Sequence, residues 1–301
     1  MLLMGMGLQA QFVVSDPVFA QRLQQAVPAA MNGIVLDTLH PSVTSLMSLN
    51  LTGSGVSNID GIQYFSSLWT LYCQSNPNLT QLPSLPITLR WAYLRDCGLT
   101  ALPALPPNLQ ELQCQGNALT SLPDLPVGLE ILICSGNPLS ELPDLPPALV
   151  RLTCLSSGLS SLPELPATLR YLNCFSNELS QLPILPPSLE ELECHYNVIT
   201  ELHELPESLQ RLICEMNSLT VLPALPPSLI RLNFQFNDIT SLPPLPGALR
   251  YLLCSNNPLQ QLPGLPDQLY QLYCGGTTLT CLPTLPNSLV HINTLNTQVN
   301  C

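Results

Sequence analysis

Residues 119–139 read LTSLPDLPVGLEILICSGNPL, and this stretch contains the complete unit from which most of the chain is built. In it, Leu129, Leu132 and Cys134 follow one another at short intervals, and Asn137 comes shortly before the next Leu. Cys134 stands at a regular position that another Leu or Val would also suit. The same position recurs 20 residues later at Cys154, so the question is what these cysteines do.

The unit L-x-x-L-x-C-x-x-N-x-L-x-x-L-P-x-L-P-x-x repeats along nearly the whole sequence. Its Cys position is filled in order by Leu51, Cys73, Leu94, Cys114, Cys134, Cys154, Cys174, Cys194, Cys214, Phe234, Cys254, Cys274 and Thr294. A fixed period over many copies is the signature of a solenoid, in which each unit packs only on its neighbours. The spacing matches the leucine-rich repeat pattern L-x-x-L-x-L-x-x-N/C-x-L.

Each position of the unit has a physical role. The segment around L-x-C predicts a short strand whose Leu and Cys side chains point inward, because side chains alternate between the two faces of a strand. Strands of successive units then pair in parallel. The Asn position, with Asn117 and Asn137 as examples, predicts a turn in which the amide bonds to backbone groups that would otherwise lack partners. Cys97 fills this position once.

The return leg, L-P-x-L-P, excludes an α-helix. Proline donates no backbone hydrogen bond and pushes the preceding residue into extended or polyproline II geometry. We therefore expect an α/β-type repeat solenoid that is essentially all-β, with one parallel strand per repeat and a polyproline II-like convex side.

The start of the chain predicts a cap for this solenoid. Residues 1–10 are apolar and have the composition of a signal-peptide remnant, which favours a secreted or cell-surface protein. Residues 11–42 are expected to form the N-terminal cap, with a short helix that begins after Ser15-Asp16-Pro17. Residues 43–301 form the solenoid of about 13 units, the last incomplete, and we expect the chain to be a fragment of a longer protein.

Charge and composition exclude several classes of function. The chain has 46% hydrophobic residues, too many for a disordered protein, and its formal net charge is −12 with no Lys. Nucleic-acid binding needs cations that neutralise phosphates, so we expect none. No apolar run reaches the ~20 residues of a membrane span. We expect a monomer without a cofactor.

The cysteines in the repeat are best explained as core residues. Cys behaves as a small hydrophobe, and its side chain is compact enough to stack between strands about 4.8 Å apart. A straight column does not supply converging metal ligands, and a buried thiol is a poor nucleophile, so we expect neither a metal site nor catalysis. Cys281 and Cys301 stand outside the column, at equivalent positions of consecutive units, and are the candidate disulfide.

The outward strand positions are the candidate binding surface. Aromatic, Arg and acidic residues gather over four adjacent units, and we name these residues the central patch: Tyr171, Phe175, Glu191, Glu193, His195, Tyr196, Arg211, Glu215, Met216, Arg231 and Phe236. Arg and Tyr are typical of interface hot spots. Three carboxylates near His195 also suggest cation binding or acid–base chemistry, but a shallow strand face excludes little water, so we expect no enzyme.

The repeats SLPDLPVGLEILICSGNPLSELPDLPPALVRL resemble the Pro-rich leucine-rich repeats of type III secreted bacterial effectors. The start, VSDPVFAQRLQQAVPAAMNGIVLDT, resembles that of secreted or surface leucine-rich repeat proteins of Bacteroidota. The resemblance implies a solenoid that binds other proteins, those of a host included. In the ubiquitin ligases of the effector class, a separate helical domain carries the catalytic Cys, and no such segment is present in this sequence.

Two functions follow as expectations. The first is a protein–protein interaction module that binds its partner on the concave face through the central patch. The alternative is a carbohydrate-binding or adhesive surface module, in which Trp91, Tyr93 and Tyr171 stack on sugar rings.

Overall fold

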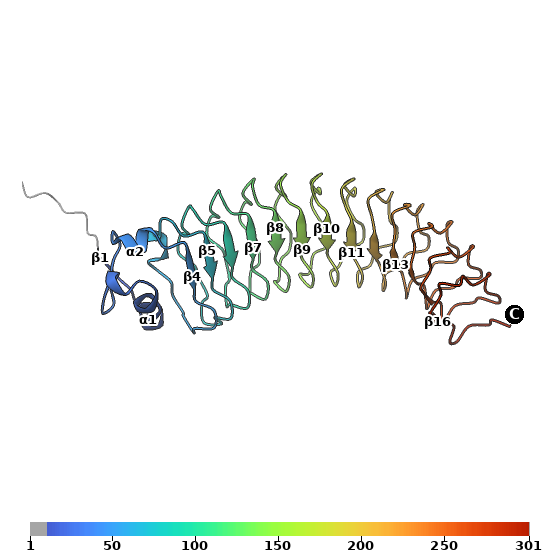
Figure 1. Ribbon diagram of the computed structural model, residues 1–301, viewed down its shortest axis with the longest axis horizontal. Coiled ribbons are helices and arrows are strands. Elements are labelled where there is room, and N and C mark those ends of the chain that lie inside the picture. Colours follow the sequence, from blue (N-terminus) through green and yellow to red (C-terminus); the bar gives the residue numbers. More distant parts are fainter. Residues whose placement is uncertain (1–10, 301) are drawn as a thin grey trace, which may run out of the picture. The chain divides into compact units, whose positions relative to one another are not determined.

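The computed structural model describes residues 11–300 (Figure 1). These residues form two compact units, with the boundary between Leu139 and Ser140. The predicted signal-peptide remnant and Cys301 lie outside the described residues. The disulfide between Cys281 and Cys301 therefore stays a prediction. Among residues 11–300, no helix is both long and apolar enough to cross a bilayer.

The first unit begins with the N-terminal cap. Its elements are β1 (Gln11–Val13), α1 (Pro17–Ala26), the 3-10 helix η1 (Pro28–Ala30), β2 (Met31–Asn32), β3 (Val35–Asp37) and α2 (Pro41–Thr44). The predicted helix is α1, whose Phe19, Ala20 and Leu23 are buried. The sequence did not predict the antiparallel sheet β1-β3-β2, because strands of two or three residues are too short to show an alternating pattern.

The repeats of the first unit follow the cap. Their strands are β4 (Ser48–Asn50), β5 (Thr70–Tyr72), β6 (Trp91–Tyr93), β7 (Glu111–Gln113) and β8 (Ile131–Ile133), with the 3-10 helix η2 (Ile62–Tyr64) between β4 and β5. Each strand pairs in parallel with the next, so equivalent positions of successive repeats lie side by side.

The second unit consists of repeats alone. Its strands are β9 (Arg151–Thr153), β10 (Tyr171–Asn173), β11 (Glu191–Glu193), β12 (Arg211–Ile213), β13 (Arg231–Asn233), β14 (Tyr251–Leu253), β15 (Gln271–Tyr273) and β16 (His291–Asn293). They pair in parallel and in register from β9 to β16. The prediction of one parallel strand per repeat is confirmed.

The core of each unit is formed by the Leu and Cys columns. Leu172 and Leu192 at the strand centres are at most 1% exposed, and Cys174 and Cys194 are fully buried. Phe234 also fits fully buried in the Cys column, between two repeats that carry the smaller Cys214 and Cys254. The cysteines are therefore packing residues, as the sequence predicted.

Burial also sets the chemistry of these thiols. It raises the pKa of Cys134 and of Cys194 to about 12, and it raises the pKa of Cys174 and Cys214 well above the ordinary value. Deprotonation is disfavoured because the thiolate has no water around it.

We therefore expect the column thiols of the native protein to resist a maleimide reagent at neutral pH and to react once the protein is denatured. Peptide mapping by mass spectrometry checks this residue by residue. Rapid labelling of Cys174 or Cys194 in the native protein would contradict the inward position of the column.

The return legs are extended and, between β5 and β16, carry no helix in the described residues. The second Pro of each L-P-x-L-P segment begins a tight turn. In the turn at Pro86, for example, the N–H of Leu89 donates to the carbonyl of Pro86. A hydroxyl on this turn joins consecutive repeats: Ser208 Oγ donates to the carbonyls of Pro187 (2.7 Å) and Leu189 (2.6 Å). In repeats with Ser or Thr at this position, the return leg is thus joined to its neighbour by a side chain–backbone bond rather than by a helix.

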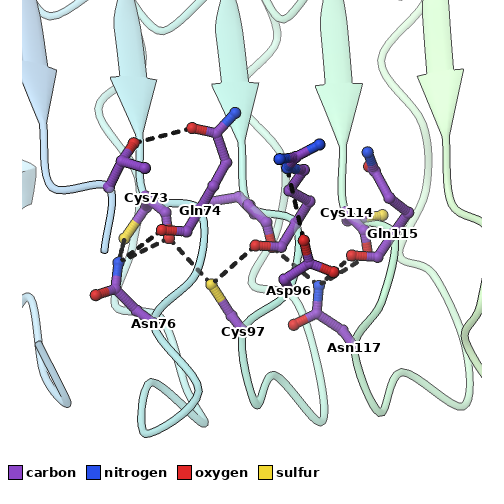
Figure 2. Close-up of polar contacts among 11 residues, drawn as sticks. Cys73, Gln74, Asn76, Asp96, Cys97, Cys114, Gln115 and Asn117 are labelled. Atoms are coloured by element: carbon purple, nitrogen blue, oxygen red, sulfur yellow. Dashed lines mark hydrogen bonds and ion pairs between the residues drawn. The ribbon is translucent and has the colours of Figure 1, made fainter. Parts of the chain in front are cut away.

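The Asn positions form a second ladder, at the ends of the strands. Asn117 Nδ2 donates to the carbonyls of Leu94 (2.9 Å) and Cys114 (2.8 Å), while its Oδ1 accepts the N–H of Leu99 (3.1 Å). Figure 2 shows the same arrangement on the preceding turns, where Asn76 and Cys97 reach toward strand-end carbonyls.

Cys97 can replace Asn because its turn needs only a donor. Its Sγ donates to the carbonyl of Cys73 (3.0 Å). The N–H of Leu79 in the repeat before it already donates to the carbonyl of Asn76, so no side-chain acceptor is required there. The extra residue in that turn, which makes the step from Cys73 to Leu94 one longer, accounts for this exception.

Candidate functional site

The central patch lies entirely in the second unit. Tyr171, Glu191, Arg211 and Arg231 occupy the first position of β10, β11, β12 and β13 and are paired in register. Parallel strands lie about 4.8 Å apart, so these four side chains form one continuous row. The remaining patch residues stand on the same strands or on the turns that follow them.

Arg211, in this row, forms an ion pair with Glu193, at the third position of β11. Arg211 binds Glu193 through two nitrogens, with N–O distances of 2.9 and 3.1 Å. The other carboxylate oxygen of Glu193 accepts a hydrogen bond from Asn173 Nδ2 at 2.9 Å. Both oxygens of Glu193 are thus engaged by groups of this chain.

Arg231 is held in a different way. Its guanidinium lies over the ring of Tyr251, 4.8 Å from the ring centroid. A cation–π contact leaves the guanidinium N–H groups able to reach a further acceptor. Arg151 lies similarly over Tyr171, at 4.4 Å. Tyr251 stands at the first position of β14, in register with Arg231.

Phe175, His195 and Tyr196 form an aromatic cluster at the carboxyl ends of β10 and β11. The rings of Phe175 and His195 stack at 4.3 Å with an angle of 19°, and Tyr196 meets His195 edge-on at 5.6 Å. His195 Nδ1 is buried and has no hydrogen-bond partner in the described residues. Burial lowers the pKa of His195, opposed by Glu215 and Glu193, and this favours the neutral ring.

Two open depressions lie within or beside the central patch, and they share no lining residue. One, of about 370 Å³, lies at the start of the strands and is lined by Glu191, Gln210, Arg211, Ile230, Arg231 and Tyr251. The other, of about 710 Å³, lies at the turns after the strands and includes Tyr196, Met216 and Phe236 in its lining. The central patch therefore contributes to two separate concave regions.

Some outward positions are less available than the sequence suggested. Ile213, at an outward strand position, is 6% exposed, and Asn233, its neighbour in the next strand, is 8% exposed. Asn233 Nδ2 donates to a carboxylate oxygen of Glu215, and long side chains of adjacent strands cover this middle row. Alternation along the strand gives the face of a residue, whereas its exposure depends on its neighbours in the next repeats.

The carboxylates near His195 do not gather into a metal site. Among residues 11–300, no group of three or more His, Cys, Asp or Glu side chains converges so as to hold an ion. Glu193 is saturated by Arg211 and Asn173, and Glu215 accepts from Asn233. The arrangement provides polar and aromatic contacts rather than an enclosed reaction site.

Comparison with known proteins shows which solved structures the chain is similar to. No family model matches the chain, and no curated protein matches it. Among solved structures, YopM from Yersinia enterocolitica WA-314 is 37% identical with a TM-score of 0.77, over 80% of this chain and 58% of that chain. The chain thus spans less than two thirds of that protein.

Two further structures are similar. YopM from Yersinia pestis, described as a leucine-rich effector protein, is 32% identical with a TM-score of 0.63, over 84% of both chains. The functional domain of InlJ from Listeria monocytogenes is 24% identical with a TM-score of 0.71, over 94% of this chain and 70% of that chain. That domain is described as including a cysteine ladder, and the likeness supports the shared fold.

Proposed function

We propose that this chain, which belongs to the bacterial leucine-rich repeat proteins that include YopM, acts by binding another protein through the central patch. One observation carries the proposal. On adjacent in-register strands, the Glu193–Arg211 pair lies beside an aromatic cluster whose rings are exposed or half-buried. Protein interfaces combine apolar and aromatic anchors with a polar rim in this way.

The face formed by the outward strand positions is the proposed contact surface, and we expect it to be concave. Its two depressions are open rather than enclosed, which suits contact with a protein surface better than chemistry on a small molecule. We further propose that the protein acts outside the cell that makes it, as its apolar residues 1–10 suggest.

Arg211→Ala tests this function. We expect it to weaken partner binding by about 2 kcal/mol, because it removes a two-nitrogen contact to Glu193 and a guanidinium from the centre of the patch. Stability should change little, since the pair is partly solvated. Host proteins that bind the immobilised protein are first identified by mass spectrometry. The dissociation constant between the identified partner and each variant is then measured by calorimetry.

Gln113→Ala is the control for Arg211→Ala. Gln113 occupies an outward strand position of the first unit, away from the central patch. A normal dissociation constant for Arg211→Ala, together with lost binding for Gln113→Ala, would show that the partner contacts another surface.

A carbohydrate-binding or adhesive module is the second candidate. Sugar rings need the open faces of aromatic side chains, and two of the three rings concerned are covered on one face. Tyr93 stacks on Tyr72 at 4.9 Å with an angle of 7°, and Arg151 covers Tyr171. These contacts favour protein binding over glycan binding, and a glycan array with Tyr171→Ala as the comparison separates the two.

A further inference from the structure

One turn position has a left-handed backbone in every repeat. It directly precedes the Asn position, and its φ is positive at Gly53, Ser75, Asp96, Gly116, Gly136, Ser156, Ser176, Tyr196, Met216, Phe236, Asn256, Gly276 and Asn296. The fold imposes this geometry because the chain leaves the strand here and the Asn amide must reach back to the strand carbonyls.

Small or turn-forming residues fill this position except in three consecutive repeats. Gly tolerates the left-handed region best because it has no Cβ, and Asn and Asp tolerate it because their short polar side chains hydrogen-bond locally, whereas bulky side chains are uncommon there. Tyr196, Met216 and Phe236 adopt φ values of 52°, 54° and 54°. We name these three residues the turn ridge. Strained backbone of this kind is concentrated at functional sites.

Burial in the core does not compensate for this strain. Tyr196 is 52% exposed, Met216 39% and Phe236 50%, so much of each apolar side chain contacts water in this structure. The turn ridge lines the depression of about 710 Å³, and the small residues Gly158 and Ser176 line it as well. The strain and the exposure together indicate a surface that is completed by a partner.

The charges around the turn ridge indicate what that partner carries. Glu178 lines the depression, and Asp238 follows the turn that contains Phe236; both are exposed. The Arg residues of the second unit stand at the starts of the strands rather than on the turns: Arg151, Arg170, Arg211, Arg231 and Arg250. With no Lys in the chain, the apolar ridge has acidic flanks and no cation on its turns.

We propose that the turn ridge anchors a polypeptide segment of the partner whose apolar side chains are flanked by Lys or Arg. The proposal rests on the proposed function and adds the chemistry of the partner. The apolar side chains insert between Phe236, Met216 and Tyr196 toward Ser176, and the basic groups meet Glu178 and Asp238. The net charge of −12 further favours a basic partner and opposes an anionic lipid surface.

The test uses a phage-displayed library of random dodecapeptides selected on the whole protein. We expect the selected peptides to combine large apolar residues with Lys or Arg. Their affinity is then compared between the native protein and the variant Tyr196→Ser/Met216→Ser/Phe236→Ser. Ser is the residue that Ser156 and Ser176 place at this position, so the variant should fold normally.

The expected result has two parts. Binding should weaken roughly tenfold or more, while the melting temperature should change little, because Ser156 and Ser176 show that this left-handed position accepts Ser. Val221→Ser is the matched control, since Val221 is an exposed apolar residue (56%) on the return leg, away from the ridge. It should bind the peptides normally.

The remaining outcomes would overturn the proposal. Normal binding by the triple variant means that the ridge is not the anchor; if Arg211→Ala then loses binding, the proposed function stands without it. A fall in melting temperature as large as that of a core variant means that the ridge is structural. Selection of acidic peptides or none, or ridge-dependent binding to phosphatidylcholine vesicles alone, would also refute it.

Discussion

Asp16→Ala is expected to lower the free energy of unfolding by about 3–5 kcal/mol, although Asp16 precedes the first repeat in the sequence. Its Oδ1 caps α1 by accepting the N–H groups of Val18 (2.8 Å) and Phe19 (2.9 Å). Its Oδ2 accepts from the N–H and hydroxyl of Ser57 (2.7 and 2.8 Å) and from the N–H of Asn58 (3.0 Å). Asp16 is 6% exposed, so its loss leaves the buried N–H of Phe19 and several partly buried donors without their partner.

The two halves of this effect are separable. Asp16→Ser retains a good N-cap but cannot reach Ser57 and Asn58, so it should lose only the bridge to the first repeats. Urea unfolding followed by circular dichroism measures both variants. Equal losses for Ser and Ala would show that capping contributes nothing, and a loss below about 1 kcal/mol for Ala would refute the bridge.

The same residue predicts a pH dependence. Burial raises the carboxyl pKa of Asp16, but the hydrogen bonds from Phe19, Ser57 and Asn58 together outweigh it and lower the pKa below 3.8. A carboxyl with a lowered folded-state pKa stabilises the protein above its unfolded-state pKa, and this contribution is lost as the pH falls through the folded-state value. Asp16→Ser should therefore unfold with a weaker dependence on pH below about 4.

Leu172→Ala is expected to lower the free energy of unfolding by about 2–5 kcal/mol. Leu172 is 1% exposed and lies in register with Leu152 and Leu192, so its truncation opens a cavity between three repeats. A solenoid has few contacts outside neighbouring repeats, so little of the structure can collapse into that space. Denaturant unfolding measures the effect.

Ile184→Ala is the matched control for Leu172→Ala. Ile184 is also apolar, but it is 85% exposed on a return leg, so its truncation should change stability by less than about 0.5 kcal/mol. If Leu172→Ala were as neutral as Ile184→Ala, the inward register of the strands would be wrong.

The candidate site was only partly predictable. The outward row of Tyr171, Glu191, Arg211 and Arg231 follows from strand alternation and a constant period, and the structure places it accordingly. The stacking of Phe175 on His195 was not predictable, because it depends on side-chain rotamers in two repeats.

The solenoid could be predicted from the amino-acid pattern alone. Its period, the inward Leu and Cys columns, the turn at the Asn position and the extended L-P-x-L-P return legs between β5 and β16 each follow from residues within a single repeat. Local patterns of this kind are visible in sequence because alternation and the constraints of proline act over a few neighbouring residues.

Which of those residues interact across repeats became visible only in the folded structure. The bridge from Asp16 to Ser57, the hydroxyl ladder of Ser208 and the left-handed strain at Phe236 leave no local pattern. The first two depend on packing, which brings residues from different parts of the chain together. The third depends on a backbone dihedral angle that the turn imposes. A repeat pattern specifies the position of each residue within a unit, whereas contacts between units arise once the units are stacked.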